Sequence, residues 1–166
     1  MNILFLHGLE SKLSDEKKVI LETYGTVIAP DLEYKSNPKV IQNLYDEFKN
    51  QDINSIIGSS MGGFVGFHLA NSLGICALLY NPALPYRNNV EQIIPSSLPT
   101  KQSLLMRIVL GGQDDIIKAK DNLAFLAQNC NPKTDCTIST KSDLAHQIPV
   151  DVFKEETKAF FKALCY

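Results

Sequence analysis

The stretch that decides the fold reads NSIIGSSMGGFVG and spans residues 54–66. Its first part, 54–57, is β-branched and predicts a buried strand, and a helical segment from Met61 to about Leu73 follows closely. Between them, Gly58-Ser59-Ser60-Met61-Gly62 matches the pattern G-x-S-x-G with Ser60 at its centre. Such a turn holds the serine in a strained backbone conformation, and small neighbours permit a close backbone approach. The stretch therefore predicts a strand–turn–helix unit that exposes the Ser60 hydroxyl.

A second interpretation of the same stretch is a glycine-rich helix start with a serine N-cap. Such a helix start can bind a phosphate at the positive end of the helix dipole. However, the lysine of a P-loop is missing, and no G-x-G-x-x-G follows any predicted strand. The nucleophile interpretation is therefore preferred.

Strand-like and helical segments alternate along the rest of the chain. The expected strands are Asn2–Leu6, Thr26–Ala29, Asn54–Ile57, Ile75–Tyr80, Leu105–Leu110 and Cys136–Ser139. The expected helices are Ser14–Glu22, Pro38–Phe48, Met61–Leu73, Ile116–Gln128 and Asp151–Leu164. The strands are separated by crossover-length connections, which predicts an α/β fold with a parallel sheet of six strands and helices on both faces. The proline-rich segment 82–104 is a short, cap-like excursion between the fourth and fifth strands.

Composition narrows the class of protein further. The chain has 166 residues, of which 45% are hydrophobic and 20% are charged, as expected for a single globular domain spanning 1–166. A net charge of -2 leaves no broad basic face, so nucleic acid is not an expected partner. The apolar runs are far shorter than the ~20 residues of a membrane span.

The start of the chain and its cysteines indicate the compartment. MNILFLHG lacks the basic segment and the long apolar run of a signal peptide. Cys76, Cys130, Cys136 and Cys165 show no metal-ligand spacing, which favours reduced thiols. We therefore expect a cytoplasmic protein with no bound metal.

A serine nucleophile needs a base that takes its proton. The positions of the three histidines in the chain indicate which one can be that base. His68 lies eight residues beyond Ser60 on the same predicted helix, ~12 Å along its axis, which is too far. His7 ends the first strand and precedes the serine. In hydrolases with such an elbow the order is serine, acid, histidine, and only His146, after the last strand, satisfies it. His146 is therefore the candidate base.

The acid that orients the histidine lies between these two residues in the chain. The acidic residues in that interval are Glu91, Asp114, Asp115, Asp121, Asp135 and Asp143. Glu91 lies in the excursion and Asp121 lies within a predicted helix. Asp135 precedes a strand, and Asp143 is only three residues from the histidine. Asp114 and Asp115 instead follow the fifth strand in a glycine turn. Asp114 is favoured, because Asp115 can instead begin the next helix, where its carboxylate complements the helix dipole. Asp115 stays the alternative acid.

The reaction also needs donors for a developing oxyanion. In this type of fold one donor is the N–H after the nucleophile, here that of Met61. The other comes from the loop after the opening strand, His7-Gly8-Leu9-Glu10-Ser11, where the Leu9 N–H is the candidate. The simpler alternative is that His7-Gly8 merely ends the strand in a turn.

These motifs together resemble the YqiA-like small esterases of the α/β-hydrolase superfamily. The motifs are HGLES at 7–11, GSSMGGF at 58–64, NPA at 81–83, GGQDD at 111–115, and His146. The resemblance implies a parallel sheet flanked by helices, Ser60 as nucleophile, His146 as base, and hydrolysis of an ester or thioester without a cofactor. The chain departs from the family in the acid loop, where a GDE-like run is usual and Gln113 stands between Gly112 and Asp114.

The predicted function is that of a serine hydrolase that cleaves a small carboxylic ester or thioester with a Ser60–His146–Asp114 triad. The alternative is a catalytically idle α/β-hydrolase fold that serves as a binding protein, which the retained serine and histidine disfavour. Because the chain is short, we expect a trimmed α/β-hydrolase core with no large lid. The excursion is expected to form one wall of the acyl pocket, with Leu84, Tyr86 and Ile93 as the candidate residues. The alternative for these three is that they pack against the top of the sheet.

Overall fold

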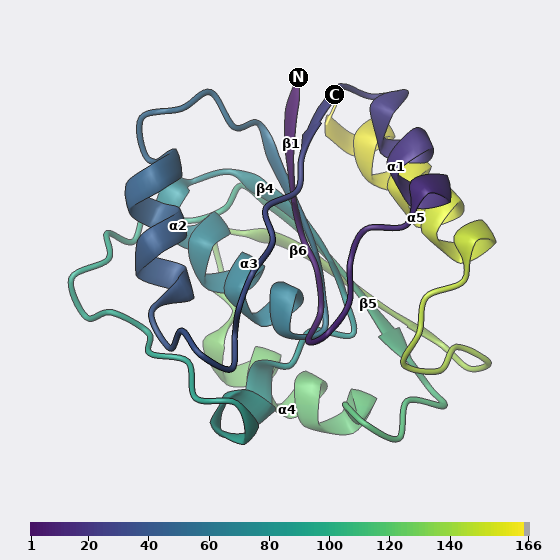
Figure 1. Cartoon of the computed structure of the whole chain (residues 1–166). Coiled ribbons are helices and arrows are strands. Elements are labelled where there is room, and N and C mark those ends of the chain that lie inside the picture. The colour runs from purple at the N-terminus through teal and green to yellow at the C-terminus, as the bar shows by residue number, and fades with distance from the viewer. Residues whose placement is uncertain (165–166) are drawn as a thin grey trace.

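The computed structural model describes residues 1–164, with side chains at all of these positions except 87 and 88. Six strands form one parallel sheet in the order β2-β1-β3-β4-β5-β6 (Figure 1). The strands are β1 (Asn2–Leu6), β2 (Thr26–Ile28), β3 (Ser55–Ser59), β4 (Cys76–Tyr80), β5 (Leu105–Gly111) and β6 (Asp135–Lys141). The helices are α1 (Asp15–Glu22), α2 (Val40–Phe48), α3 (Met61–Leu73), the 3-10 helix η1 (Leu84–Asn89), α4 (Ala119–Asn129) and α5 (Val150–Leu164). The predicted six-stranded parallel sheet is confirmed.

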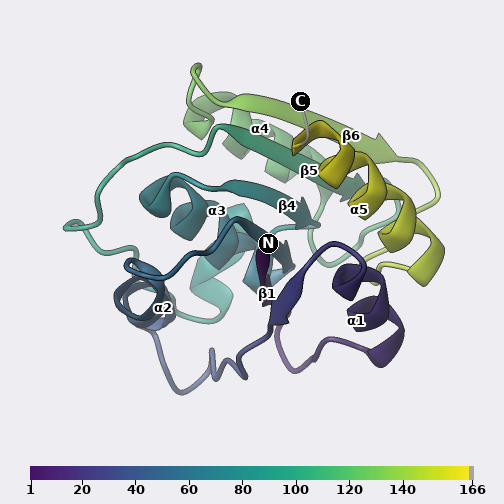
Figure 2. The same cartoon turned by 90° about the horizontal axis from the view of Figure 1, so that it is seen from above.

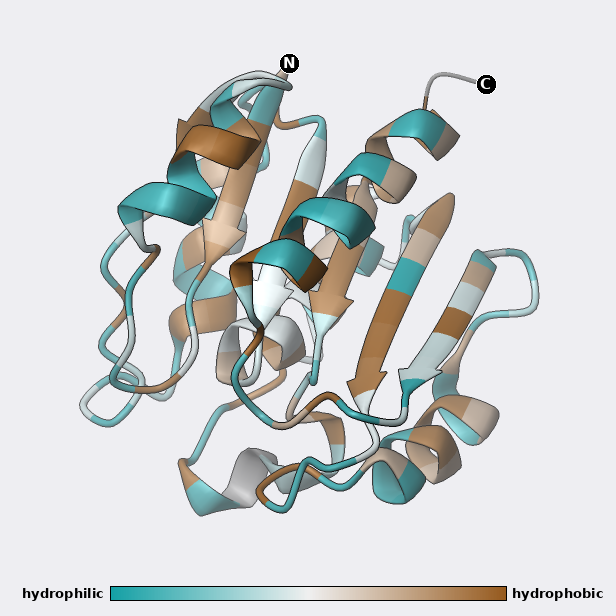
Figure 3. Cartoon of the chain, turned by 90° about the vertical axis from the view of Figure 1, so that its right-hand side faces the viewer, coloured by the Kyte–Doolittle hydropathy of each residue, from teal (hydrophilic) through white to brown (hydrophobic). Residues whose placement is uncertain are grey.

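The sheet is covered by helices on both faces, as the alternation of segments predicts (Figure 2). Helices α1 and α5 lie side by side on one face and bury Leu21, Phe153 and Phe160 against it. Helices α2, α3 and α4 cover the other face, where Leu44 and Phe64 are buried. Figure 3 views the α1–α5 side and shows the hydrophilic residues of α5 turned away from the sheet. The inner strands are therefore enclosed on both faces, which explains their continuous apolar runs.

Two helix ends lie at the capping residues that the sequence predicts, and one helix start does not. Helix α1 begins where the Ser14 hydroxyl accepts the Lys17 N–H at 3.4 Å, and α3 ends at Gly74, which adopts a left-handed φ of 74°. Helix α4 begins at Ala119 and not at Ile116. The Ile116 N–H donates to the side chain of Asp114 in a turn and does not join a helix. The expected helix start at Ile116 was therefore wrong.

An ionic cluster joins helix α5 to the strands at the β6 edge of the sheet. Glu156 is 3% exposed, and its carboxylate accepts from Arg107 Nη2 at 2.8 Å and from Lys141 Nζ at 2.9 Å. Burial alone would raise the pKa of the Glu156 carboxyl, but the hydrogen bonds from Lys141 and Arg107 outweigh it and leave the pKa lowered. The ionised form of Glu156 therefore stabilises the contact between α5 and the sheet.

The excursion between β4 and β5 follows the helical layer of α2, α3 and α4. Its first part, η1, packs against α3 and α4. Its second part is tied down by the Gln92 amide, which donates to the carbonyl oxygens of Tyr34 and Asn37 at 3.0 and 2.9 Å. Within residues 1–164, no helix combines the length and the apolar character that crossing a membrane requires.

Candidate active site

Ser60 occupies the sharp corner between strand β3 and helix α3. Its backbone has φ 53° and ψ -117°, the conformation of the first central residue of a type II′ turn, which glycine adopts far more readily than serine. The corner is held by neighbouring chain, since the Ser60 N–H donates to Tyr80 O and the Ser60 carbonyl accepts from Ala83 N, both at 2.9 Å. The strained serine predicted from the sequence motif is therefore present.

Two glycines allow this corner to form. A Cβ on Gly62 would lie 2.1 Å from the Leu6 carbonyl oxygen, and one on Gly58 would lie 2.4 Å from the Gly62 carbonyl oxygen. Neither position can accept a side chain without moving backbone. The first turn of α3 consequently sits directly against the end of β1, close to the loop that the sequence assigns to the oxyanion.

His146 and Asp114 meet at the carboxyl ends of β5 and β6. His146 Nδ1 lies 2.8 Å from Asp114 Oδ2, and the side chains are 20% and 0% exposed respectively. The other carboxylate oxygen, Oδ1, accepts the N–H groups of Ile116 and Ile117 at 2.9 and 2.7 Å. These two hydrogen bonds fix the orientation of the Asp114 carboxylate, so its second oxygen, Oδ2, faces the imidazole of His146.

Asp115, the alternative acid, points elsewhere. It is exposed, and no contact between it and His146 is found among the described residues. It does not begin a helix either, because α4 starts four residues later at Ala119. The structure thus brings Asp114 to the histidine and leaves Asp115 in solvent.

Ser60 and His146 line one cavity of about 350 Å³. The loop after β1 forms a second wall, with Leu9 among its residues, and Lys17 of helix α1 forms part of a third. Met61 is the first residue of α3, where the N–H groups have no partner within the helix. The cavity therefore gathers three features of the predicted site, namely the serine, the histidine and the loop with Leu9; Met61 follows Ser60 in the chain but does not line the cavity.

The expected acyl-pocket wall is not built as predicted. None of the excursion residues that the structure describes lines the cavity of Ser60. Leu84 is 2% exposed and belongs to the core beside α3, and the Tyr86 hydroxyl donates to Asp121 of helix α4. Ile93 is 43% exposed. These side chains are occupied in packing the excursion against the helices or lie in solvent, and the cavity is bounded instead by α1 and the loop before α5.

His7 holds the loop after β1 in place. Its Nε2 accepts the Leu32 N–H at 2.9 Å, so the proton of the neutral ring is on Nδ1, which donates to Gly8 O at 2.6 Å. The Tyr34 hydroxyl donates to the His7 carbonyl at 2.8 Å. With both ring nitrogens engaged, His7 positions the backbone beside Leu9 and is not free to act as a base.

Asn81 is a site residue to which sequence reasoning gave no role. Its side chain is almost fully buried, and its Nδ2 donates to the carbonyl oxygens of Ala145 and His146 at 3.0 and 3.1 Å. Its Oδ1 accepts the Gly111 N–H at 2.7 Å. Asn81 therefore links the histidine loop to the end of the strand that leads to Asp114. Two signals were available in the sequence: NPA at 81–83 is one of the motifs of the family resemblance, and Asn81-Pro82 after a strand marks a turn.

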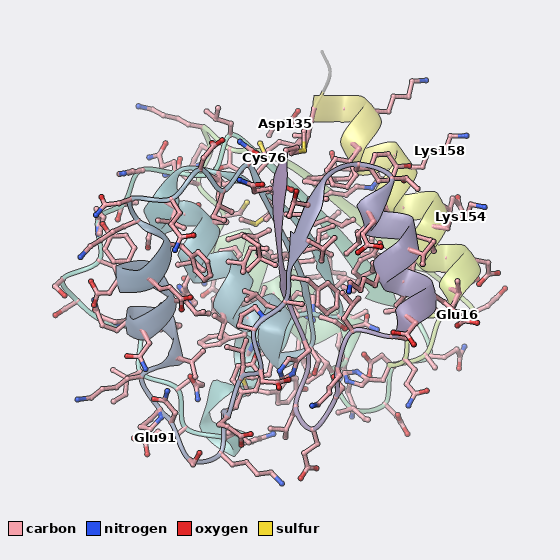
Figure 4. The ribbon with its side chains drawn as sticks, turned by 45° about the horizontal axis from the view of Figure 1, so that its top comes forward. Glu16, Cys76, Glu91, Asp135, Lys154 and Lys158 are labelled. Atoms are coloured by element: carbon pink, nitrogen blue, oxygen red, sulfur yellow. The ribbon has the colours of Figure 1, made fainter. Side chains whose placement is uncertain are left out.

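The remaining candidate histidine and acids lie outside this cluster. His68 packs its ring edge-on against Phe64 and Phe67 within α3. Asp135 and Cys76 are the first residues of β6 and β4, with β5 between them, and Glu91 lies far from both (Figure 4). Asp143 accepts a hydrogen bond from its neighbour Ser142 at 2.7 Å.

None of the three described cysteines lines the cavity of Ser60. Cys76, Cys130 and Cys136 are free thiols, and Cys165 lies outside the described residues. Among residues 1–164, no group of three His, Cys, Asp or Glu side chains is arranged to hold a metal ion.

Solved structures share the architecture of the whole chain. SOBER1 from Arabidopsis thaliana superimposes with a TM-score of 0.71 at 16% identity, over 100% of this chain and 99% of that one. Mouse alpha/beta hydrolase domain-containing protein 10 gives 0.69 at 14%, over 98% and 90%. The Bacillus cereus carboxylesterase gives 0.66 at 17%, over 97% and 87%. At these identities the likenesses establish the α/β-hydrolase fold.

The sequence itself identifies the family. No curated protein matches it. A family model does, over residues 2–106, which hold the motifs HGLES, GSSMGGF and NPA. This match covers more than half of the chain and confirms the resemblance predicted from those motifs. The chain therefore belongs to the uncharacterised protein family UPF0227.

Proposed function

We propose that this chain is a cofactor-independent serine hydrolase that cleaves a carboxylic ester or thioester. The observation that carries the proposal is the contact of 2.8 Å between the buried Asp114 and His146, since His146 lines the same cavity as the strained Ser60. A serine becomes nucleophilic when a base takes its proton and a third group orients that base. The α/β-hydrolase fold and the carboxylesterase among its structural neighbours support the same class of reaction.

The first half of the reaction forms an acyl-enzyme. Ser60 Oγ attacks the acyl carbon while His146 Nε2 takes the hydroxyl proton, and Asp114 stabilises the resulting imidazolium through Nδ1. The backbone N–H groups of Leu9 and Met61 stabilise the tetrahedral oxyanion. His146 then gives its proton to the leaving alcohol or thiol as the bond between that group and the acyl carbon breaks.

The second half releases the acid. Water attacks the acyl carbon of the Ser60 ester, and His146 takes a proton from that water. The tetrahedral intermediate collapses, the proton returns to Ser60 Oγ, and the carboxylic acid leaves. Each step uses only side chains and backbone of this chain together with water.

A fluorophosphonate probe tests the proposal, because it modifies serines that are activated by a base. Wild type is expected to be labelled once, at Ser60, and Ser60→Ala and His146→Ala are expected to lose the label. Ser142→Ala, which removes an exposed serine outside the cavity, serves as the matched control and should label like wild type. A wild-type protein that is not labelled, or labelling that survives Ser60→Ala, would refute the hydrolase and favour the idle binding fold.

A further inference from the structure

The cavity beside Ser60 contains a lysine without a carboxylate partner. Lys17 lies in the first turn of helix α1 and lines the same cavity as Ser60 and His146. Its side chain is half-buried. Within residues 1–164, no ion pair to Lys17 is found. The Lys17 ammonium is thus held at the wall of the cavity without an ion pair, and the attraction of the adjacent Glu16 offsets only part of the cost of its burial.

The other charged side chains that bound this cavity do have partners. Glu10 pairs with Lys35, and Lys12 pairs with Asp31 at 3.4 Å. His146 has its carboxylate in Asp114. Among the described residues, Lys17 is therefore the charged side chain of this cavity wall that forms no ion pair.

The setting of Lys17 makes that charge costly. Its Nζ lies 5.4 Å from the centre of the Phe153 ring, at the start of helix α5. Burial lowers the pKa of the Lys17 ammonium, which reports the loss of solvent around it. An aromatic face compensates only part of the lost hydration of an ammonium group. A bound anion would compensate much more.

We propose that the ester or thioester cleaved at Ser60 carries a separate anionic group, a carboxylate or a phosphate, which Lys17 binds. This inference rests on the proposed hydrolase function and adds the substrate class. The anion can belong either to the acyl part or to the leaving group, because Lys17 and Ser60 line one cavity of about 350 Å³. In either case Lys17 acts on specificity and takes no part in the chemical step.

Two pairs of matched esters test the inference. The p-nitrophenyl monoester of succinic acid and p-nitrophenyl butyrate have acyl chains of equal length and differ in a terminal carboxylate. Para-acetoxybenzoate and its methyl ester differ in the charge of the leaving group. The measured quantity is the ratio of kcat/KM for the anionic ester to that for its neutral counterpart, with wild type, Lys17→Met, Lys17→Arg and Lys18→Met. Lys18 is the matched control because it is the next residue, is exposed, and pairs with Glu22.

Wild type is expected to prefer the anionic member of at least one pair, and that pair identifies the part of the substrate that Lys17 binds. Lys17→Met should lower the ratio about tenfold, the size expected for a partly screened ion pair. Lys17→Arg should keep most of the ratio, and Lys18→Met should leave it unchanged. Raising the salt concentration should reduce the wild-type ratio, because ions screen the attraction.

The outcomes separate this inference from the function on which it rests. If Ser60-dependent hydrolysis occurs but wild type favours the neutral ester in both pairs, the anionic substrate is refuted while the hydrolase stands. An unchanged ratio in Lys17→Met refutes it equally. If no ester in either pair is hydrolysed in a Ser60-dependent manner, the proposed function fails and takes the inference with it.

Discussion

Replacing Asn81 by Asp tests whether the buried amide positions the histidine. Asp has the same shape as Asn and tolerates the positive φ of 40° at this position. It keeps the acceptor for the Gly111 N–H but removes the two donations from Nδ2, to Ala145 O and His146 O. The change therefore removes the link to the histidine loop and leaves the link to the acid strand.

The expected size follows from those two contacts. A buried hydrogen bond contributes about 1 kcal/mol net, and a carbonyl left without a donor costs about 1–3 kcal/mol. Losing two donations should lower the free energy of unfolding by about 2–6 kcal/mol, against the 5–15 kcal/mol typical of a domain, and the buried Asp carboxylate adds to this loss because it faces the two carbonyl oxygens. A displacement of about 1 Å at a catalytic group can cost 10²-fold in rate, so we expect kcat to fall about 10- to 100-fold. KM should change little, because Asn81 does not line the cavity.

The assay is hydrolysis of a short p-nitrophenyl ester, with urea unfolding of the same samples. Asn71→Asp is the matched control, since Asn71 Nδ2 donates to Phe67 O at 2.9 Å near the far end of α3. That variant should lose stability without losing kcat. If Asn81→Asp loses stability as expected but keeps wild-type kcat, the amide supports the fold only, and the positioning argument is wrong.

Three further changes have distinct expected results. Asp114→Asn should lower kcat by about 10⁴-fold, as in serine-protease triads, whereas Asp115→Asn should have little effect; equal small losses would mean that neither is the triad acid. Glu156→Gln should lower the free energy of unfolding near pH 7 by about 2 kcal/mol. Because the pKa of Glu156 is lowered in the fold, its contribution is present above the ordinary value of 4.5 and is lost as the pH falls through the folded-state value. Urea titrations should therefore show the gap between Glu156→Gln and wild type closing in acid, and a constant gap would contradict this. Gly62→Ala should unfold the protein or leave it insoluble, because its Cβ would lie 2.1 Å from the Leu6 carbonyl; normal melting by circular dichroism would argue against that clash.

The fold was predictable because its strands are enclosed on both faces and its helices carry clear end signals. Helix α3 runs from Met61 to Leu73 as expected, since the serine corner and Gly74 mark its two ends. The start of α4 was missed for the opposite reason. Ile116 and Ile117 continue a helical pattern, but their N–H groups bond to Asp114, so the chain turns before the helix begins.

The site was predictable only as far as chain order and strand ends define it. Which of Asp114 and Asp115 faces the histidine depends on the side-chain direction within a turn, and the sequence pattern does not encode it. The role of Asn81 depends on contacts with residues 64 and 65 positions away. Leu84 of the excursion was a candidate for the wall of the acyl pocket, but its side chain is buried in the hydrophobic core beside α3.

The backbone of Ser60 has a consequence for the history of this family. At φ 53° and ψ -117°, a serine costs about 1–2 kcal/mol more than a glycine would. Ser60→Gly should therefore yield a protein that is inactive and more heat-resistant than its parent. Where selection for catalysis is relaxed, thermal stability alone favours glycine at this corner. A descendant that has lost its activity is then expected to reveal the loss by a glycine there, with the fold otherwise intact.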